Sequence, residues 1–297
     1  MKYAITGSLG HISKPIVTAL IKAGHEVIVI TSNNDRVKEI QSLGAKAAVG
    51  SIENVPFLTQ AFAGADAVYT MVPPNFAATN WKEYIGHIGK NYAEAIKANN
   101  IKYVVNLSSV GAHLSNGVGP VSGLYKAEQA LNALSGVHIK HLRPAYFYQN
   151  LLANIGMIKQ VGIIGSNFSA ADKRFVIVHP ADIAEIAVQE LLLLNFSGHG
   201  AQYIASDEIS TDEIATTIGK AIHKPDLKWI TFTDEQALQG AIEAGLPEEI
   251  AKNYTEMGHS MNSGEMTADY WKNRPSVLGK IKLKDFAGEF AAAYSAS

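Results

Sequence analysis

A glycine-containing turn separates the first apolar segment of the chain from the first helical segment. The segment Tyr3–Thr6 is typical of a strand, and it is followed by the spacing G-x-x-G-x-x-S at Gly7, Gly10 and Ser13. Backbone N–H groups at such a strand-to-helix turn can bind the pyrophosphate of a dinucleotide. The spacing departs from the G-x-G-x-x-G fingerprint, so a plain structural turn is the alternative. We expect the cofactor to contact Gly7, Ser8, Leu9, Gly10, His11 and Ile12.

The end of the second strand indicates which dinucleotide would bind. The β-branched run Val27–Ile30 is followed by T-S-N-N-D-R, which ends at Arg36. NAD is usually held at this point by an acidic residue on its ribose 2′-hydroxyl. Here no acid follows the strand directly, and small polar side chains precede an arginine, which can bind a 2′-phosphate. We therefore expect NADP(H) as the cofactor, contacted by Ser32, Asn33 and Arg36. In the alternative, Arg36 is simply a solvated residue of the next helix.

A frame of alternating strands and helices has to position these residues. Up to residue 145, short apolar runs alternate with segments of helical periodicity, which is typical of a doubly wound parallel sheet. The predicted strands are Tyr3–Thr6, Val27–Ile30, Ala45–Val49, Ala67–Val72, Tyr103–Leu107 and Val137–Leu142. The predicted helices are Ile12–Ala23, Val37–Leu43, Val55–Phe62, Asn80–Ala98 and Pro120–Leu134. The fold class that we predict is α/β, with a Rossmann-like doubly wound parallel sheet.

Ligands of such sheets bind beyond the carboxyl ends of the strands. The predicted fourth and fifth strands lead to residues that we expect to contact the cofactor, namely Met71, Val72, Pro73 and Ser108. The sixth strand closes at Arg143-Pro144, and three aromatic residues follow at positions 146–148. We expect Tyr146 and Phe147 to contact a planar substrate. In the alternative at least one of the three aromatic residues is ordinary core, and Phe147 or Tyr148 is the candidate.

The second half of the chain predicts a smaller C-terminal α/β lobe. A strand at Phe175–His179 and an apolar helix at Ala181–Leu194 continue the first pattern, and Gln202–Ala205 is a further candidate strand. Capping boxes at Ser210 and Thr233 then open two helices. We expect residues 1–148 and 174–206 to form the NADP-binding Rossmann domain. Residues 149–173 and 207–297 would form the smaller lobe that covers the substrate.

Composition excludes several function classes. The chain has 25 basic and 27 acidic residues, and this balance gives no reason to expect a nucleic-acid partner. It has no cysteine, which excludes disulfides, thiol nucleophiles and cysteine-ligated metals, and its histidines form no metal motif. No apolar run approaches the length of a membrane span, and the first strand begins too early to leave room for a signal peptide. We expect a soluble, cytoplasmic protein.

Three segments together resemble the NmrA-like family, an atypical branch of the short-chain dehydrogenase/reductase superfamily. They are the turn Tyr3–Ser13, the run Leu142–Phe147 with Asn150, and the run Val178–Ala184. The resemblance covers nearly the whole chain in order and spacing. It implies a Rossmann domain that binds NADP and a small C-terminal domain above the nicotinamide. Within the third segment, we expect His179 and Asp182 to be structural, with Asp182 bonded to backbone or to Arg143.

The proton-transfer pair of the larger superfamily is missing here. That superfamily uses a serine with a tyrosine and a lysine spaced Y-x-x-x-K, and Glu128 resembles a glutamate that often follows the lysine. Counting back from Glu128, the lysine and tyrosine positions fall on Leu124 and Pro120. Tyr125 and Lys126 are out of phase with these positions on a helix. Ser108 and Tyr125 are the remaining catalytic candidates, and we expect Lys126 to be a surface residue.

These observations favour an NADPH-dependent reductase of a small apolar electrophile, such as a quinone or an enone. Hydride transfer to such a substrate depends on proximity and a polarising donor more than on a dedicated proton relay. Interconversion of alcohols and ketones, which needs a strong general acid, is disfavoured. The alternative is a non-catalytic NADP(H)-sensing regulatory protein, which would act through a protein partner. Substrate identity, oligomeric state and pathway are not encoded in any recognisable pattern.

Overall fold

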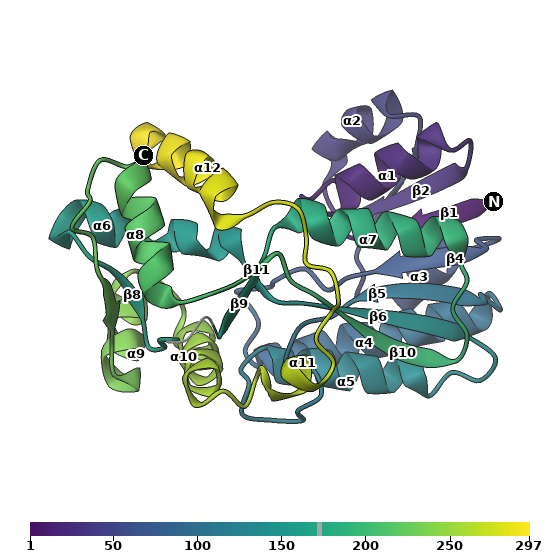
Figure 1. The fold of residues 1–297 in the computed structure, drawn as a ribbon. Coiled ribbons are helices and arrows are strands. Elements are labelled where there is room, and N and C mark those ends of the chain that lie inside the picture. The colour runs from purple at the N-terminus through teal and green to yellow at the C-terminus, as the bar shows by residue number, and fades with distance from the viewer. Residues whose placement is uncertain (171–173) are drawn as a thin grey trace.

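A seven-stranded parallel sheet forms the centre of the computed structural model, which describes residues 1–170 and 174–297 (Figure 1). Its strand order is β10-β6-β5-β4-β1-β2-β3, so the order reverses between β1 and β4. The strands are β1 (Lys2–Ile5), β2 (Glu26–Thr31), β3 (Lys46–Val49), β4 (Ala67–Thr70), β5 (Tyr103–Leu107), β6 (His138–Pro144) and β10 (His199–Ile204). The predicted Rossmann-like doubly wound sheet is confirmed, and ligands of this architecture bind at the point of reversal.

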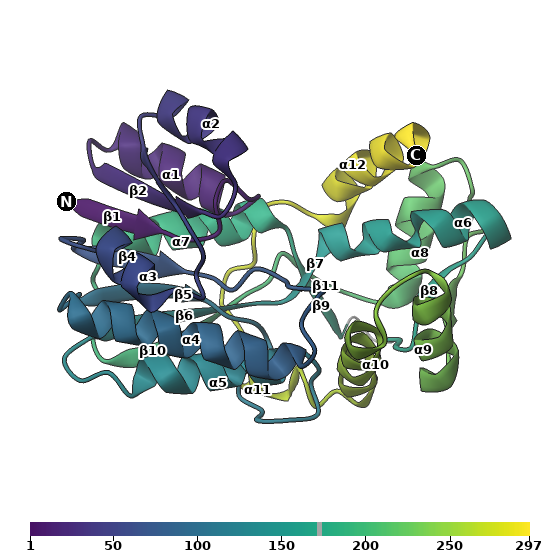
Figure 2. The same cartoon turned by 180° about the vertical axis from the view of Figure 1, so that it is seen from behind.

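Helices cover both faces of the sheet (Figures 1 and 2). One face carries α1 (Ser13–Lys22), α2 (Val37–Ser42) and α7 (Pro180–Leu193), whose apolar side chains share one core with β1 and β2. The other face carries α3 (Val55–Ala61), α4 (Trp81–Ala98) and α5 (Val121–Asn132). Since both faces are covered, most residues of the central strands are apolar, which is why their sequence runs were recognisable.

Two details of the sheet differ from the prediction. The sixth strand continues through Arg143 and Pro144 instead of closing at Leu142. It continues because β10 pairs with it in parallel up to its last residue, from the pair Ile139–His199 to the pair Pro144–Ile204. The candidate strand at 202–205 is this seventh strand, and it begins three residues earlier than expected.

A second, smaller lobe has its own apolar core, which includes Tyr148, Phe168, Trp229 and Phe286. Its short strands form two small sheets, β11-β9-β7 and β12-β8. The predicted capping boxes at Ser210 and Thr233 are confirmed at the starts of α8 and α9. The elements are β7 (Tyr146–Phe147), the 3-10 helix η2 (Tyr148–Asn154), α6 (Ile155–Val161), β8 (Ile164–Ser166), β9 (Phe175–Val178), β11 (Asp207–Ile209), α8 (Thr211–Ala221), β12 (Trp229–Thr231), α9 (Asp234–Glu243), α10 (Glu248–Ser263), α11 (Ala268–Lys272) and α12 (Leu283–Ala296).

The chain crosses between the two lobes several times. Tyr270 in α11 and Met266 just before it belong to the same core as β1 and α7. The helices on either side of α11, α10 and α12, extend along the smaller lobe. The predicted domain boundaries stay a prediction, and their junction at 173/174 touches residues 171–173, which lie outside the described residues. Within the described ranges, no helix is both long and apolar enough to cross a membrane.

Candidate active site

The turn after β1 can be occupied only by glycine at its first position. Gly7 has φ +85°, and a Cβ there would lie 2.8 Å from the Met71 side chain and from Ser13 Oγ. Ser13 is buried, and its hydroxyl donates to the carbonyl of Thr6 at 3.1 Å. Serine thus takes the place of the third glycine of the fingerprint by turning its side chain back onto the strand end. The ends of β1 and β4 are also joined, because Met71 N donates to Thr6 Oγ1 at 2.8 Å.

The same turn offers backbone donors to an anion. Ser8 is tied to the end of β2, since its N–H donates to the Ile30 carbonyl at 3.1 Å and its Oγ lies 3.0 Å from Thr31 Oγ1. In contrast, the N–H groups of His11 and Ile12 have no partner among the described residues. Free N–H groups at the start of a helix suit a phosphate. The geometry of the turn therefore fits the pyrophosphate of a dinucleotide.

Arg36 lies beside this turn. Asn33 Oδ1 accepts from Asp35 N at 2.8 Å, which caps the 3-10 helix η1 (Asn34–Arg36) at the end of β2. Arg36 and the glycine turn line one open groove, whose described lining residues are Leu9, Gly10, His11, Lys14, Pro15, Thr18, Ala19, Lys22, Arg36 and Glu39. Ser32 is exposed at the strand end. The order β4-β1-β2 thus gathers the predicted cofactor residues of three separate segments at one edge of the sheet.

The two serines after β5 differ in their surroundings. Ser108 is buried, and its hydroxyl donates to Glu128 Oε1 on α5 at 2.5 Å. Ser109, one residue on, lines an open cavity. Lys126 forms an ion pair with Glu83 on α4, in agreement with the surface role expected for it. Tyr125 is half-buried and is absent from the described linings of the cavities reported below.

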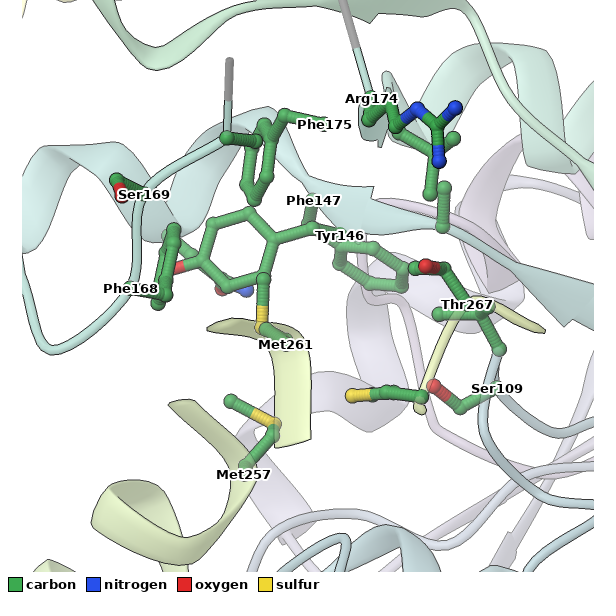
Figure 3. Close-up of a pocket in the computed structure, with 16 residues that line it drawn as sticks. Ser109, Tyr146, Phe147, Phe168, Ser169, Arg174, Phe175, Met257, Met261 and Thr267 are labelled. Atoms are coloured by element: carbon green, nitrogen blue, oxygen red, sulfur yellow. The ribbon is translucent and has the colours of Figure 1, made fainter. Parts of the chain in front are cut away.

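A cavity of about 220 Å³ lies where the carboxyl ends of β5 and β6 meet the smaller lobe (Figure 3). Ser109, Val110 and Ala145 form its wall on the side of the sheet. The remaining lining is mostly aromatic and sulfur-containing, with Tyr146, Phe147, Asn150, Phe168, Ser169, Ala170, Arg174, Phe175, Val176, Met257, Met261, Met266 and Thr267. Such a lining suits a flat, apolar ring.

Two further cavities, of about 540 and 430 Å³, adjoin the first one. All three share Tyr146, Asn150 and Phe168. The additional walls come from η2, α6, β8, β12, α9 and α10 and from Phe76 in the loop after β4. The cavities therefore form one cleft between the lobes, with Tyr146 at its centre.

Tyr146 is held in a cluster of aromatic rings. Its ring centroid lies 5.8 Å from that of Phe168 and 5.3 Å from that of Phe175, and Figure 3 shows the three rings together. Burial raises the pKa of its hydroxyl, and this hydroxyl has no hydrogen-bond partner among the described residues. Tyr146 is thus a free neutral donor in the cleft. Tyr148, by contrast, is fully buried with its hydroxyl on Asp207, which confirms that one of the three aromatic residues is core.

Several lining residues were missed by the sequence analysis. Phe168 lies in no recognisable motif, and no motif in the segment of α10 indicated that it would line a cavity. Met257 and Met261 are four residues apart on α10, so their side chains share one face and both reach the cavity (Figure 3). This spacing is the one signal that could have indicated them.

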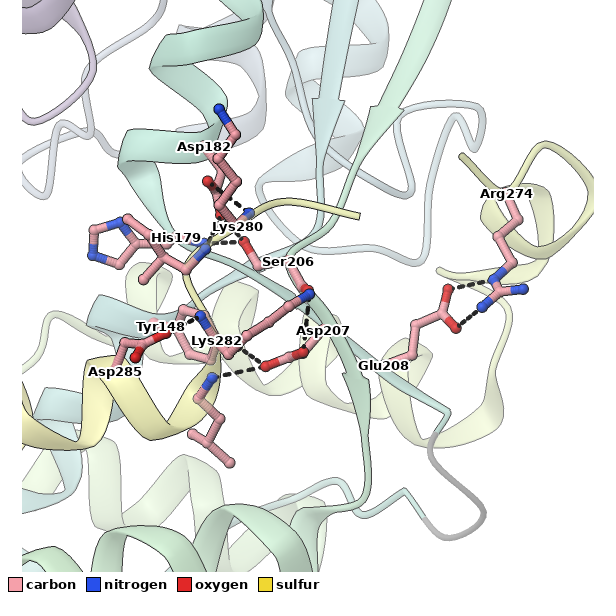
Figure 4. Close-up of polar contacts among 12 residues, drawn as sticks. Tyr148, His179, Asp182, Ser206, Asp207, Glu208, Arg274, Lys280, Lys282 and Asp285 are labelled. Carbon is pink, nitrogen blue, oxygen red and sulfur yellow. Dashed lines mark hydrogen bonds and ion pairs between the residues drawn. The ribbon is translucent and has the colours of Figure 1, made fainter. Parts of the chain in front are cut away.

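The motif around His179 and Asp182 holds the lobes together (Figure 4). His179 caps α7 by accepting from Ala181 N. Asp182 accepts from Ser206 Oγ at 2.6 Å and from the backbone N–H groups of Lys280 and Ile281, each at 3.1 Å. The expected structural role of both residues is confirmed, and of the two partners expected for Asp182, backbone is present and Arg143 is not.

A family model now adds independent evidence. The model of the NmrA-like family matches residues 2–279. The chain belongs to the NmrA-like family. The NAD(P)H azoreductase of Xenophilus azovorans is 23% identical to it over 293 residues, which cover 99% of this chain and 98% of that protein.

Solved structures similar to this NmrA-like protein include two reductases. The NADPH-dependent quinone oxidoreductase of Escherichia coli, complexed with NADPH, has a TM-score of 0.82 and 17% identity, and 97% of this chain and 99% of that chain are covered. The triphenylmethane reductase of Citrobacter sp., complexed with NADP(H), has a TM-score of 0.79 and 18% identity, with 98% and 100% covered. At such identities the likeness establishes the fold alone.

Proposed function

We propose that this NmrA-like protein binds NADP(H) and reduces a small, planar, apolar electrophile such as a quinone or an enone. The observation that carries the proposal is the position of the aromatic cleft at the carboxyl ends of β5 and β6, on the same sheet edge as the glycine turn. A dinucleotide held at the turn would extend along this edge toward Ser109. Azo compounds belong to the same class of planar acceptors, and the azoreductase relative supports including them.

The residues of the cofactor site have separate tasks in this proposal. The free N–H groups of His11 and Ile12 bind the pyrophosphate, and Gly7 allows the backbone to approach it. Arg36 binds the 2′-phosphate, with Ser32 and Asn33 beside it, while Met71, Val72 and Pro73 border the adenosine end. When bound, the cofactor supplies a hydride, so a quinone that takes up this hydride and one proton leaves as the hydroquinone while NADPH becomes NADP⁺.

The residues of the cleft orient and polarise the substrate. Phe147, Phe168 and Phe175 stack against its ring and exclude water. The hydroxyls of Tyr146 and Ser109 are donors that can bond to a carbonyl oxygen as negative charge develops on it. The raised pKa of Tyr146 keeps this hydroxyl protonated, so it acts as a hydrogen-bond donor, and the product takes up its proton from solvent as it leaves the cleft.

The test is steady-state NADPH oxidation with a panel of quinones, enones and azo compounds, alongside direct NADPH binding measured by nucleotide fluorescence. We expect turnover with at least one planar acceptor and a kcat/KM about tenfold lower for Tyr146→Phe, because one hydrogen bond to developing charge is lost. Tight NADPH binding without turnover on any acceptor would instead support the non-catalytic sensor, which no described feature favours at present. Arg36→Ala should weaken NADPH binding about tenfold or more. Tighter binding of NADH than of NADPH contradicts the choice of cofactor.

A further inference from the structure

Two cations from different elements meet on one carboxylate in the groove beside the glycine turn. Lys14 Nζ lies 2.8 Å from Glu39 Oε1, and Arg36 Nη1 lies 2.9 Å from Glu39 Oε2. Lys14 belongs to α1, Arg36 to η1 and Glu39 to α2. All three line the groove together with Gly10 and His11. We propose that Lys14 and Arg36 together bind the 2′-phosphate, and that Glu39 is an internal counter-ion which the phosphate displaces.

The arrangement has the chemistry that this exchange requires. Both carboxylate oxygens of Glu39 are occupied, one by each cation, so the carboxylate holds the two side chains close together over the groove. The hydrogen bonds from Lys14 and then Arg36 keep the pKa of Glu39 below its ordinary value, so Glu39 is ionised at neutral pH. A phosphate has more negative charge and more acceptor oxygens than a carboxylate, so it can take over both cations.

The same arrangement separates the two nucleotides. A ribose 2′-hydroxyl carries no charge and cannot displace a carboxylate from two cations, so NADH binding should be insensitive to these residues. Loss of Lys14 should weaken NADPH binding, and neutralisation of Glu39 should strengthen it. Removal of Lys14 takes away a partner of the phosphate, whereas neutralisation of Glu39 takes away the competitor and its repulsion. Lys14 thus adds to the selectivity for NADPH, and Glu39 limits it.

The chain offers a matched control for a loss of positive charge. Lys46 forms a comparable exposed pair with Glu26 at 2.9 Å and lies outside the groove. It is the first residue of β3, so it lies at the opposite end of the parallel strands from the glycine turn. Exposed charges that are more than a Debye length apart are largely screened at physiological salt.

This inference rests on the proposed function, and its test is nucleotide binding, with no substrate present. The dissociation constants of NADPH and NADH are measured by fluorescence or calorimetry for the unmodified protein and for Lys14→Ala, Lys14→Arg, Glu39→Gln and Lys46→Ala. We expect Lys14→Ala to weaken NADPH binding at least fivefold, Lys14→Arg to restore most of it, and Glu39→Gln to tighten it severalfold. For the control Lys46→Ala, the NADPH dissociation constant should change by no more than about twofold, and NADH binding should stay within about twofold for all variants.

The possible results distinguish a wrong role for Lys14 or Glu39 from a wrong cofactor site. If the unmodified protein binds neither nucleotide, the proposed cofactor site itself is wrong. If it binds NADPH and Lys14→Ala behaves like Lys46→Ala, the proposed role of Lys14 is wrong while the function stands. If Glu39→Gln weakens NADPH binding, Glu39 supports the site and is not displaced from it.

Discussion

Ser108 Oγ donates to Glu128 Oε1 at 2.5 Å, and both side chains are almost fully buried. Glu128 also receives two hydrogen bonds from Arg143, from Nε at 3.0 Å and from Nη2 at 2.7 Å. The serine that the sequence offered as a catalytic candidate therefore has its hydroxyl engaged in a buried polar network. The next residue, Ser109, has the hydroxyl that lines the cleft.

We expect substitutions of the two serines to affect different properties. Ser108→Ala should lower the free energy of unfolding by about 1–3 kcal/mol, because a buried carboxylate loses one of its donors. Ser109→Ala should change stability by no more than about 0.5 kcal/mol and lower kcat/KM for a quinone severalfold. Urea unfolding and steady-state kinetics measure the two effects. If kcat/KM falls further for folded Ser108→Ala than for Ser109→Ala, Ser108 takes part in the reaction.

The pair of Glu128 and Arg143 should be strongly coupled. Burial by itself lowers the pKa of Arg143, but the hydrogen bonds and the charge of Glu128 raise it above its ordinary value, so the guanidinium stays charged. Glu128→Leu alone should cost about 3–5 kcal/mol, because it leaves the guanidinium without its main partner. Glu128→Leu with Arg143→Leu should cost clearly less than the sum of the single variants. Additive costs in a double-mutant cycle would show that the pair is not a unit.

The burial of His141 predicts that the folded protein loses stability in mild acid. It is buried between Asn106 Nδ2, 3.1 Å from its Nδ1, and Asn132 Oδ1, 2.9 Å from its Nε2, an arrangement that suits the neutral ring with its proton on Nε2. Burial lowers its pKa to about 4. An unfolded chain protonates this ring below about pH 6.5, so between these values the unfolded state binds more protons and stability falls as pH falls. The whole effect is up to about 3 kcal/mol.

The measurement is urea unfolding at several pH values between about 4 and 7. In this range the ring of His141 is protonated in the unfolded chain and neutral in the folded protein. His141→Gln should flatten the dependence of the unfolding free energy on pH, whatever it does to stability at pH 7. His138→Gln is the control, since His138 lies at the start of the same strand and is only half-buried. Equal slopes for the unmodified protein and His141→Gln contradict the assignment.

The contact between Asp182 and Gly279 should appear as a non-additive pair. A Cβ at Gly279 would lie 2.3 Å from Asp182 Oδ2, so Gly279→Ala must displace the segment that Asp182 holds. Asp182→Ala removes the acceptor of two backbone N–H groups in this segment and of Ser206. Each variant should lower the melting temperature by several degrees, and the double variant by less than the sum. Hydrogen exchange at Lys280 and Ile281 should accelerate in both, and unchanged exchange would exclude the mechanism.

Arg174 should influence which aromatic substrates bind. It is the one charged side chain among the described residues that line the three cavities. We expect Arg174→Ala to weaken binding of a carboxylated or sulfonated ring compound about threefold to tenfold, and that of its neutral analogue hardly at all. Quenching of protein fluorescence by matched pairs of dyes measures this. Equal changes for both members of a pair mean that Arg174 acts through shape and not through charge.

Much of the larger domain could be predicted because it depends on local patterns. Strands buried on both faces are apolar runs such as Val27–Ile30, and the helices between them are recognisable by their helical periodicity. Gly7 was recognisable since a tight turn tolerates no side chain there. The strand β8 of the smaller lobe has only three residues, too few to form a pattern, and it was not foreseen.

By itself, the sequence determined the doubly wound sheet, the glycine turn at its edge and the family, because each depends on local periodicity, turn geometry or a motif. Only the tertiary structure decided which side chains meet. Packing of α5 placed Glu128 beside Ser108 and left Ser109 in the cleft, and packing of α10 against α9 and α4 placed Met257 and Met261 in the cavity that Tyr146 lines. The tertiary structure also brought Lys14 of α1 to Glu39, whereas Arg36 meets Glu39 from only three residues earlier in the chain. The contacts between separate elements join residues that are distant in the chain, and no local preference specifies them.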